Sequence, residues 1–190
     1  MCGRYGADKK VNDWLTIRCR CMADGILRVG DIRPGERAPV LIAGNPNPLV
    51  VPMTWGIQGN GSPIINVRKE TIWEKPTFRH LIEHRRCILP ASCFYEWDSE
   101  KHMATLRGKE SDVLFLAGIY QAAAGGGRFV IITEPANETV KPIHDRMPVR
   151  IPEEKIGEWL SNAERAASIL DTAGVPLRTD QREEQLSLWE

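Results

Sequence analysis

Short apolar segments rich in β-branched and aromatic residues fill the middle of this sequence, and they limit most strongly how the chain can fold. Turn-forming Gly, Pro, Asn and Asp residues separate them, as is typical of strands. The predicted strands are Arg28–Ile32, Ala38–Ile42, Leu49–Trp55, Cys87–Trp97, Met103–Arg107, Val113–Tyr120 and Phe129–Thr133. Helices do not alternate with these strands, so the pattern favours an antiparallel or mixed sheet over a parallel βαβ sheet.

Helical patterns flank the strand-rich region. They cover Val11–Met22, Glu70–His84, Pro152–Leu160 and Ala163–Leu170. The length of 190 residues fits one domain of ordinary size, and nothing demands more than a monomer. We therefore predict one α+β domain over residues 1–180, with a barrel-like antiparallel or mixed sheet and flanking helices, followed by a flexible polar tail at 181–190.

The two halves of the chain differ in charge although the net charge is zero. Residues 1–95 carry 14 basic and 8 acidic side chains, and residues 96–190 carry 11 and 17. A uniformly basic nucleic-acid coat is excluded, whereas a local basic groove built from the first half is not. The sequence has neither a long apolar run nor an apolar signal core, so we expect a cytoplasmic protein without a membrane span.

The cysteines, at positions 2, 19, 21, 87 and 93, are odd in number. In a cytoplasmic chain we interpret them as reduced thiols, mostly buried. Cys19 and Cys21 lack the spacing of a zinc knuckle, and no matching Cys or His pair lies nearby. The sequence therefore predicts no metal and no cofactor.

Cys2 is the most distinctive candidate for chemistry. Met1 precedes a small residue and is of the kind that aminopeptidases remove, which would leave an α-amine and a thiol on one residue. Both groups have reference pKa values of about 8 to 8.5. The amine can form an imine with an aldehyde, and the sulfur can then close a five-membered thiazolidine. A retained Met1 would block the amine, and a cysteine near a chain start also arises by chance.

Two further stretches offer groups that could hold a ligand. Arg4 shares a face with Cys2 in an extended strand, and its guanidinium could bind a phosphate in a forked geometry. Asn66 and Arg68 follow the apolar pair Ile64-Ile65, where we expect a strand to end and a helix to follow. The alternative for each is an ordinary turn or surface residue.

Glu96 and His144 are candidate proton-transfer groups. Glu96 lies in an aromatic, strand-like run, where burial would raise its pKa and suit it to general acid–base work. An outward-facing Glu96 on an amphipathic strand is the alternative. His144 is followed by Asp145, which could orient the imidazole, and by Arg146, which offers a second phosphate fork.

Four motifs occur in one order with compatible gaps. M-C-G-R-Y at the start, N-x-R-x-E-T at 66–71, F-x-E-W at 94–97 and H-D-R-M-P at 144–148 together resemble the SRAP family, the SOS response-associated peptidase-like proteins. Trp55-Gly56 and the turn Ile32–Gly35 are also similar to motifs of that family. The resemblance runs from residue 1 to about 150 and continues thinly beyond.

The resemblance implies a protein that forms covalent links with abasic sites in single-stranded DNA as part of the DNA damage (SOS) response. Cys2 would attack the ring-opened sugar aldehyde, and Asn66 would hold the amine and the sugar. Glu96 would act as acid–base in ring opening and reversal, and His144 would assist at the sugar hydroxyl. The implied DNA contacts are Arg4, Arg68 and Arg146 to phosphates, Thr133 near the site, and Pro34 and Trp97 around the pocket, with Trp97 stacking on a base.

Two other functions stay open. One is a cysteine peptidase with Cys2 as nucleophile, since the family is described as a peptidase and its thiol could serve autoprocessing. The other is a non-covalent single-strand binding module whose Cys2 is inert. The sequence departs from the family pattern at Val67, where Ala is usual, and at Ile57–Pro63, which lacks the aromatic insert that wedges into DNA.

The tail holds one more motif. Gln185, Leu186, Leu188 and Trp189 fit the bacterial sliding-clamp binding pentapeptide Q-L-x-L-F, with Trp in place of Phe. Such short peptides dock in apolar pockets with modest affinity. The sequence therefore predicts the sliding clamp as a partner, and the alternative is a last strand or helix edge that packs on the domain.

Overall fold

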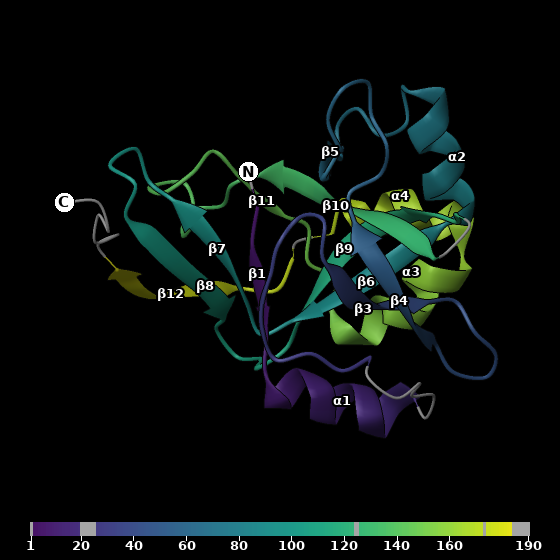
Figure 1. Ribbon diagram of the computed structural model, residues 1–190, viewed down its shortest axis with the longest axis horizontal. Helices are drawn as coiled ribbons and strands as arrows, with labels where there is room; N and C mark the ends of the chain where they lie inside the picture. Colours follow the sequence, from purple (N-terminus) through teal and green to yellow (C-terminus); the bar gives the residue numbers. More distant parts are fainter. Residues whose placement is uncertain (1, 20–25, 124–125, 173, 184–190) are drawn as a thin grey trace.

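Two sheets lying side by side form the body of the protein (Figure 1). The structure is a computed structural model that describes residues 2–19, 26–123, 126–172 and 174–183. Its strands are β1 (Tyr5–Ala7), β2 (Gly30–Ile32), β3 (Arg37–Ile42), β4 (Leu49–Trp55), β5 (Asn66–Arg68), β6 (Arg86–Ala91), β7 (Cys93–Trp97), β8 (Met103–Gly108), β9 (Leu114–Gln121), β10 (Gly127–Pro135), β11 (Arg146–Pro148) and β12 (Leu177–Glu183). Its α-helices are α1 (Lys9–Cys19), α2 (Pro76–His84), α3 (Ile156–Ser161) and α4 (Ala163–Leu170), and a 3-10 turn at Glu153–Lys155 precedes α3.

The larger sheet closes on itself. Its order is β11-β10-β4-β3-β6-β9, and β9 also pairs with β10, so five strands form a closed ring. Most pairs are antiparallel, whereas β10 runs parallel to β4 and to β5. Trp55 of β4 and Phe129 of β10 lie opposite each other in this sheet, are fully buried and stack with ring centroids 6.1 Å apart. The prediction of one α+β domain with a barrel-like mixed sheet is therefore confirmed.

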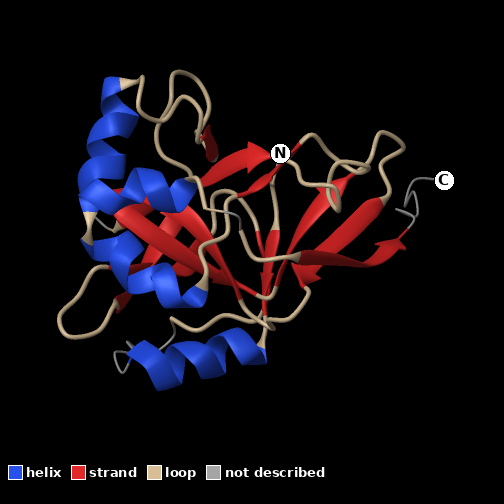
Figure 2. Ribbon diagram, turned by 180° about the vertical axis from the view of Figure 1, so that it is seen from behind, coloured by secondary structure: helices blue, strands red, loops and turns tan. Residues whose placement is uncertain are grey.

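The second sheet has the order β12-β8-β7-β1-β2 and carries the start of the chain. β1 pairs antiparallel with β2 on one side and with β7 on the other. Figure 2 shows that the helices gather around the closed sheet and leave the far end of this five-stranded sheet uncovered. Within the described ranges, no helix has the length and apolar character needed to cross a bilayer.

A buried arginine joins α2 and α3 to the barrel. Arg86, at the start of β6, donates to the carbonyl oxygens of Ile82 and Glu83 near the end of α2 at 2.7 and 2.6 Å. Its Nε donates to the Trp159 carbonyl of α3 at 2.5 Å. Carbonyls in the last turn of a helix lack intrahelical partners, so the guanidinium satisfies them and complements the negative helix ends.

The predicted strand Cys87–Trp97 is wrong as a single element. It divides at Ser92 into β6 and β7, which belong to different sheets. The Ser92 N–H donates to the Gly6 carbonyl at 2.8 Å instead of to a partner in the barrel. The chain therefore crosses from one sheet to the other at Ser92, although the apolar pattern of the sequence continues on both sides of this residue.

The helix predicted over Glu70–His84 is also too long. Residues 69–75 form turns, and the helix begins at Pro76, which lies at its first position. Proline fits there because the first N–H of a helix needs no intrahelical acceptor, and its ring pushes the preceding Lys75 into an extended conformation (φ −88°, ψ 120°). At the first of the four predicted helices, Asp8 Oδ1 caps α1 by accepting from the N–H groups of Lys10 and Val11.

Several strands were not predicted. β1, β5 and β11 have three residues each, and β5 begins at Asn66, where a strand was predicted to end. β12 contains the predicted domain boundary at residue 180. The predicted end of the first helix at residues 20–22 and the proposed clamp peptide at 185–189 lie outside the described residues.

Candidate active site

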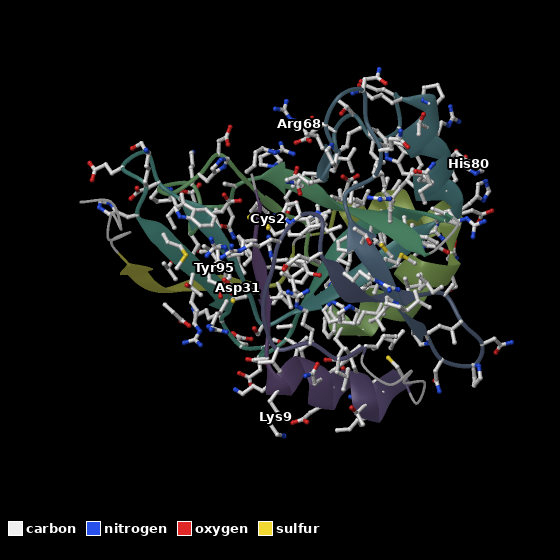
Figure 3. The ribbon with its side chains drawn as sticks, in the orientation of Figure 1. Cys2, Lys9, Asp31, Arg68, His80 and Tyr95 are labelled. Atoms are coloured by element: carbon white, nitrogen blue, oxygen red, sulfur yellow. The ribbon has the colours of Figure 1, made fainter. Side chains whose placement is uncertain are left out.

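Cys2 precedes β1, where the two sheets meet (Figure 3). The side chain is fully buried, and its Sγ–H donates to the Arg4 carbonyl at 3.6 Å. The Tyr95 N–H donates to that same carbonyl at 3.0 Å, which extends the β1–β7 pairing toward Cys2. The second sheet thus fixes the candidate nucleophile from the side of β7.

Asn66 holds Cys2 from the side of the barrel. Its Nδ2 donates to the Cys2 carbonyl at 2.8 Å, although 64 positions separate the two residues in sequence. Asn66 is held in turn by β5, which pairs parallel with β10 so that Asn66 lies opposite Ile131. Its Oδ1 is buried and has no hydrogen-bond partner in the described part of the chain. That oxygen can accept a hydrogen bond from an amine or a hydroxyl group.

Glu96 lies next to this pair on β7. It is 1% exposed, and burial raises its pKa to about 7. The pKa of the Cys2 thiol lies far above its ordinary value, mainly because the thiol is buried and secondly because of the charge of Glu96. The carboxyl and the thiol are therefore within electrostatic reach, and near neutral pH Glu96 can both give and take a proton. Of the two alternatives for Glu96, the structure shows the buried one, and its acid–base role stays a prediction.

His144 lies in the turn that leads into β11. Its Nδ1 accepts a hydrogen bond from the Arg146 N–H at 3.0 Å, so the neutral ring carries its proton on Nε2. Asp145 Oδ1 lies 2.8 Å from the same Nδ1, a contact that is a hydrogen bond only when Nδ1 carries a proton, as in the imidazolium or in the other neutral tautomer. Burial lowers the pKa of His144, which favours the neutral ring and hence the Arg146 contact.

Arg4 and Trp97 contact each other at the edge of the site, and both side chains are partly exposed. The Arg4 guanidinium lies 4.9 Å from the Trp97 ring centre and 5.7 Å from that of Tyr95. Its Nη1 also lies 3.4 Å from Asp31 Oδ2, with a quarter of the side chain exposed. Asp31 comes from β2, and no sequence pattern predicts this partner because the pairing of β1 with β2 creates it.

Arg68 and Pro34, two further predicted DNA contacts, are both exposed to solvent. Arg68 is exposed at the end of β5, and no ion pair with another described residue is formed. In Figure 3 it lies on the opposite side of Cys2 from Tyr95 and Asp31. Pro34 is exposed in the turn between β2 and β3, where the N–H of the next residue, Gly35, donates to the Trp55 carbonyl at 2.8 Å.

Arg146 and Thr133 form a separate cluster with Glu70, the acidic residue of the N-x-R-x-E-T motif. Thr133 is fully buried, and its carbonyl and hydroxyl oxygens accept hydrogen bonds from Arg146 Nη2 at 2.8 and 3.3 Å. Glu70 accepts from both terminal nitrogens of Arg146. The described residues hold no group of three or more His, Cys, Asp or Glu side chains arranged to bind a metal ion.

Comparison with known proteins places these residues in a family. The model of the family described as "SOS response associated peptidase (SRAP)" matches residues 1–187. The chain is 32% identical over 170 residues to the abasic site processing protein YoaM of Bacillus subtilis (strain 168), covering 80% of this chain and 74% of the relative. It is 26% identical over 199 residues to the abasic site processing protein YedK of Escherichia coli (strain K12), covering 93% and 88%.

Solved structures share the fold. A crystal structure of a Bordetella bronchiseptica protein superposes with a TM-score of 0.75 at 20% sequence identity, covering 95% of this chain and all of that chain. A Bacteroides thetaiotaomicron protein gives the same TM-score at 23% identity, covering 95% and 92%.

Proposed function

Because the chain belongs to the SOS response associated peptidase (SRAP) family, we propose that it processes abasic sites in single-stranded DNA by attaching itself to them through Cys2. The observation that carries this proposal is the 2.8 Å hydrogen bond from Asn66 to the Cys2 carbonyl. It fixes the backbone of the one residue that would offer both an amine and a thiol once Met1 is removed.

The covalent step joins both groups to one carbon. The Cys2 amine adds to the C1 aldehyde of the ring-opened sugar, and loss of water gives an imine. The Sγ–H then adds across the C=N bond, so that an S–C bond forms and the nitrogen gains the hydrogen. Asn66 Oδ1, buried without a partner among the described residues, is suited to orient the amine. The aldehyde itself provides the selectivity, since an abasic site has no base to read.

Glu96 would move the proton of this step. The Cys2 thiol is un-ionised at neutral pH, so its sulfur needs a base as it attacks. The Glu96 carboxylate can accept that proton, and as carboxylic acid it can return it when the ring reopens. His144, neutral with its proton on Nε2, would donate a hydrogen bond to a sugar hydroxyl.

The DNA would lie across the site on both sides of Cys2. Arg4 and Arg68 would contact phosphates, and Trp97 would stack on a base. Such contacts are independent of base sequence, which suits a protein that must find abasic sites in any context.

The direct test is the intact mass of the denatured protein before and after incubation with an oligonucleotide that carries one abasic site. The expected product has the mass of the protein without Met1 plus that of the oligonucleotide, minus one water. Protein that has lost Met1 and yet gives no adduct would contradict the proposal and favour a non-covalent binding module. Cleavage of a peptide substrate without any DNA adduct would favour a cysteine peptidase.

Replacing Arg68 by alanine should weaken binding to every single-stranded sequence alike. Loss of one phosphate contact makes the slope of log K against log salt shallower by about 0.7. The measurement is fluorescence anisotropy of two unrelated oligonucleotides across a salt series. Arg165→Ala is the matched control, because Arg165 is exposed on α4 and pairs with Glu158. Equal slopes for Arg68→Ala and wild type would exclude the phosphate contact.

We also propose the sliding clamp as a partner of the tail. Deletion of residues 185–190 should abolish binding to purified clamp and leave the rate of abasic-site capture unchanged, because the motif lies beyond β12. Surface plasmon resonance on immobilised clamp gives the first quantity, and the mass assay gives the second. Clamp binding that survives the deletion would end this proposal.

A further inference from the structure

Hydrogen bonds hold only one edge of the Arg4 guanidinium. Its Nη1 donates to Asp31 Oδ2 at 3.4 Å and lies 3.7 Å from the sulfur of Met103. The flat face of the group lies against the rings of Trp97 and Tyr95. Nε and Nη2 make no hydrogen bond with another residue in the described ranges. The edge formed by Nε and Nη2 can therefore bind a phosphate in a forked geometry.

Asp31 is held in turn by Tyr95, which comes from two strands away. β1 lies between β2, which carries Asp31, and β7, which carries Tyr95. Burial of the Tyr95 hydroxyl, its hydrogen bond with Cys93 and then that with Asp31 raise its pKa well above the ordinary range. Because an ionised carboxylate only accepts, the hydroxyl donates to Asp31 and accepts from the Cys93 thiol. Figure 3 shows Tyr95 and Asp31 side by side, on the side of Cys2 away from Arg68.

Gly6 makes this hydrogen bond across β1 possible. It lies opposite Asp31 on β2 and opposite Cys93 on β7, so the three positions share one face of the sheet. A Cβ atom at position 6 would lie 2.7 Å from Cys93 Sγ and 3.3 Å from the Tyr95 hydroxyl oxygen. The missing side chain therefore leaves the space through which Tyr95 reaches Asp31.

The position of Asp31 suits it to orient Arg4 without blocking it. A bidentate carboxylate would occupy two guanidinium nitrogens at about 2.7 to 2.9 Å, whereas Asp31 contacts Nη1 alone, at 3.4 Å. The Tyr95 hydroxyl holds the carboxylate and keeps it from closing further on the guanidinium. A phosphate is repelled by Asp31, so it approaches Arg4 from the Nε and Nη2 edge.

We propose that Asp31 and Tyr95 are positioning residues that orient Arg4, so that its Nε and Nη2 edge receives a phosphate of the DNA strand. The inference rests on the proposed function, in which Arg4 contacts a phosphate. Without Asp31 the guanidinium can rotate, and without the Tyr95 hydroxyl the carboxylate can close on it. Either loss lowers the fraction of molecules in which Arg4 is ready to bind.

The first test is a double-mutant cycle on binding to an undamaged single-stranded oligonucleotide. Tyr95→Phe keeps the ring beside Arg4 and removes only the hydroxyl. It should weaken binding about fivefold in the wild-type background and less than about 1.5-fold in an Arg4→Gln background, because residues that act through one another are not additive. No weakening in the wild-type background, or equal weakening in both, overturns the proposal.

Tyr120→Phe is the matched control for this cycle. The Tyr120 hydroxyl also accepts from an arginine, Arg85 Nη1 at 3.5 Å, and its ring centre also lies 5.7 Å from that guanidinium. The variant should leave DNA binding within about twofold of the wild type, since Tyr120 lies on β9 and not beside Arg4. Weakening as large as that of Tyr95→Phe would show a general effect of losing a tyrosine hydroxyl and overturn the proposal.

The second test separates the charge of Asp31 from its hydrogen bond. Asp31→Ala and Asp31→Asn remove the same charge, but the asparagine oxygen can still accept from Arg4 Nη1 and from Tyr95. Asp31→Asn should therefore bind the same oligonucleotide more tightly than Asp31→Ala. Equal affinities would mean that Asp31 acts only as a charge that repels DNA, and the positioning role would be overturned.

The third test needs no DNA. Nitrogen relaxation of the Arg4 Nε–H group should show an ordered side chain in the wild type and a mobile one in Tyr95→Phe and in Asp31→Ala. Equal order in the wild type and in Tyr95→Phe overturns the proposal, also where Asp31→Ala fails to fold. If the wild type captures no abasic site, the proposed function fails, and the order of the Arg4 side chain still decides the roles of Asp31 and Tyr95.

Discussion

Replacing Cys2 by alanine is expected to reduce the adduct that survives denaturation to background, a loss of at least about 100-fold. The sulfur is the atom that closes the ring, and without it the amine can form only an imine, which water hydrolyses. The measurement is the fraction of oligonucleotide that comigrates with protein on a denaturing gel after incubation with an abasic site. Non-covalent binding to the same oligonucleotide should change little, because Cys2 is buried and carries no charge.

Cys93→Ala is the matched control for this loss. Cys93 is also a buried free thiol, and it lies on the neighbouring strand β7. Its removal should leave adduct formation intact if the reaction depends on the aminothiol of Cys2 and not on any nearby sulfur. Cys2→Ala and Cys2→Ser both keep the amine of residue 2, so borohydride should trap the imine of either variant although the stable product is absent. A stable adduct from Cys2→Ala would refute the proposed chemistry.

The strands of the barrel could be predicted because burial on the sheet selects β-branched and aromatic side chains. The division of Cys87–Trp97 could not, since the apolar run continues through Ser92. The break is made by a partner far away in sequence, the Gly6 carbonyl. Three-residue strands such as β1 and β5 escape prediction for the same reason, because partners and not their own pattern define them.

Only the site residues that belong to sequence motifs could be predicted. The order of motifs brought Cys2 and Asn66 into one hypothesis, and the structure joins them by a hydrogen bond. The counter-ions of the arginines were not predicted: Asp31 reaches Arg4, and Glu70 reaches Arg146, through the pairing of strands and turns. A sequence shows which side chains carry charge, whereas the register of strands decides which charges are already neutralised.

Replacing Glu96 by glutamine is expected to slow reversal of the link by roughly 100-fold or more. When the thiazolidine opens, the C–S bond breaks and the sulfur takes a proton, which the Glu96 carboxylic acid can supply. Because burial raises the pKa of Glu96 to about 7, wild-type reversal should fall as pH rises through about 7, and ring closure, which needs the carboxylate, should rise. Glutamine should remove both dependences. Release of oligonucleotide from purified adduct, followed from pH 5 to about 9, measures the first of them.

The same pKa makes a prediction about stability that does not depend on DNA. In the unfolded chain a glutamate titrates near 4.3, well below the folded value of about 7. Between these two values Glu96 is more often protonated in the folded state than in the unfolded chain, so its contribution to the free energy of unfolding falls as pH rises and levels off above the folded pKa. Glu96→Gln should remove this fall and be more stable than wild type at about pH 8, whereas the exposed Glu100→Gln should not. Parallel urea-unfolding curves for wild type and Glu96→Gln across this range would show that the carboxyl titrates normally, and the acid–base role would lose its basis.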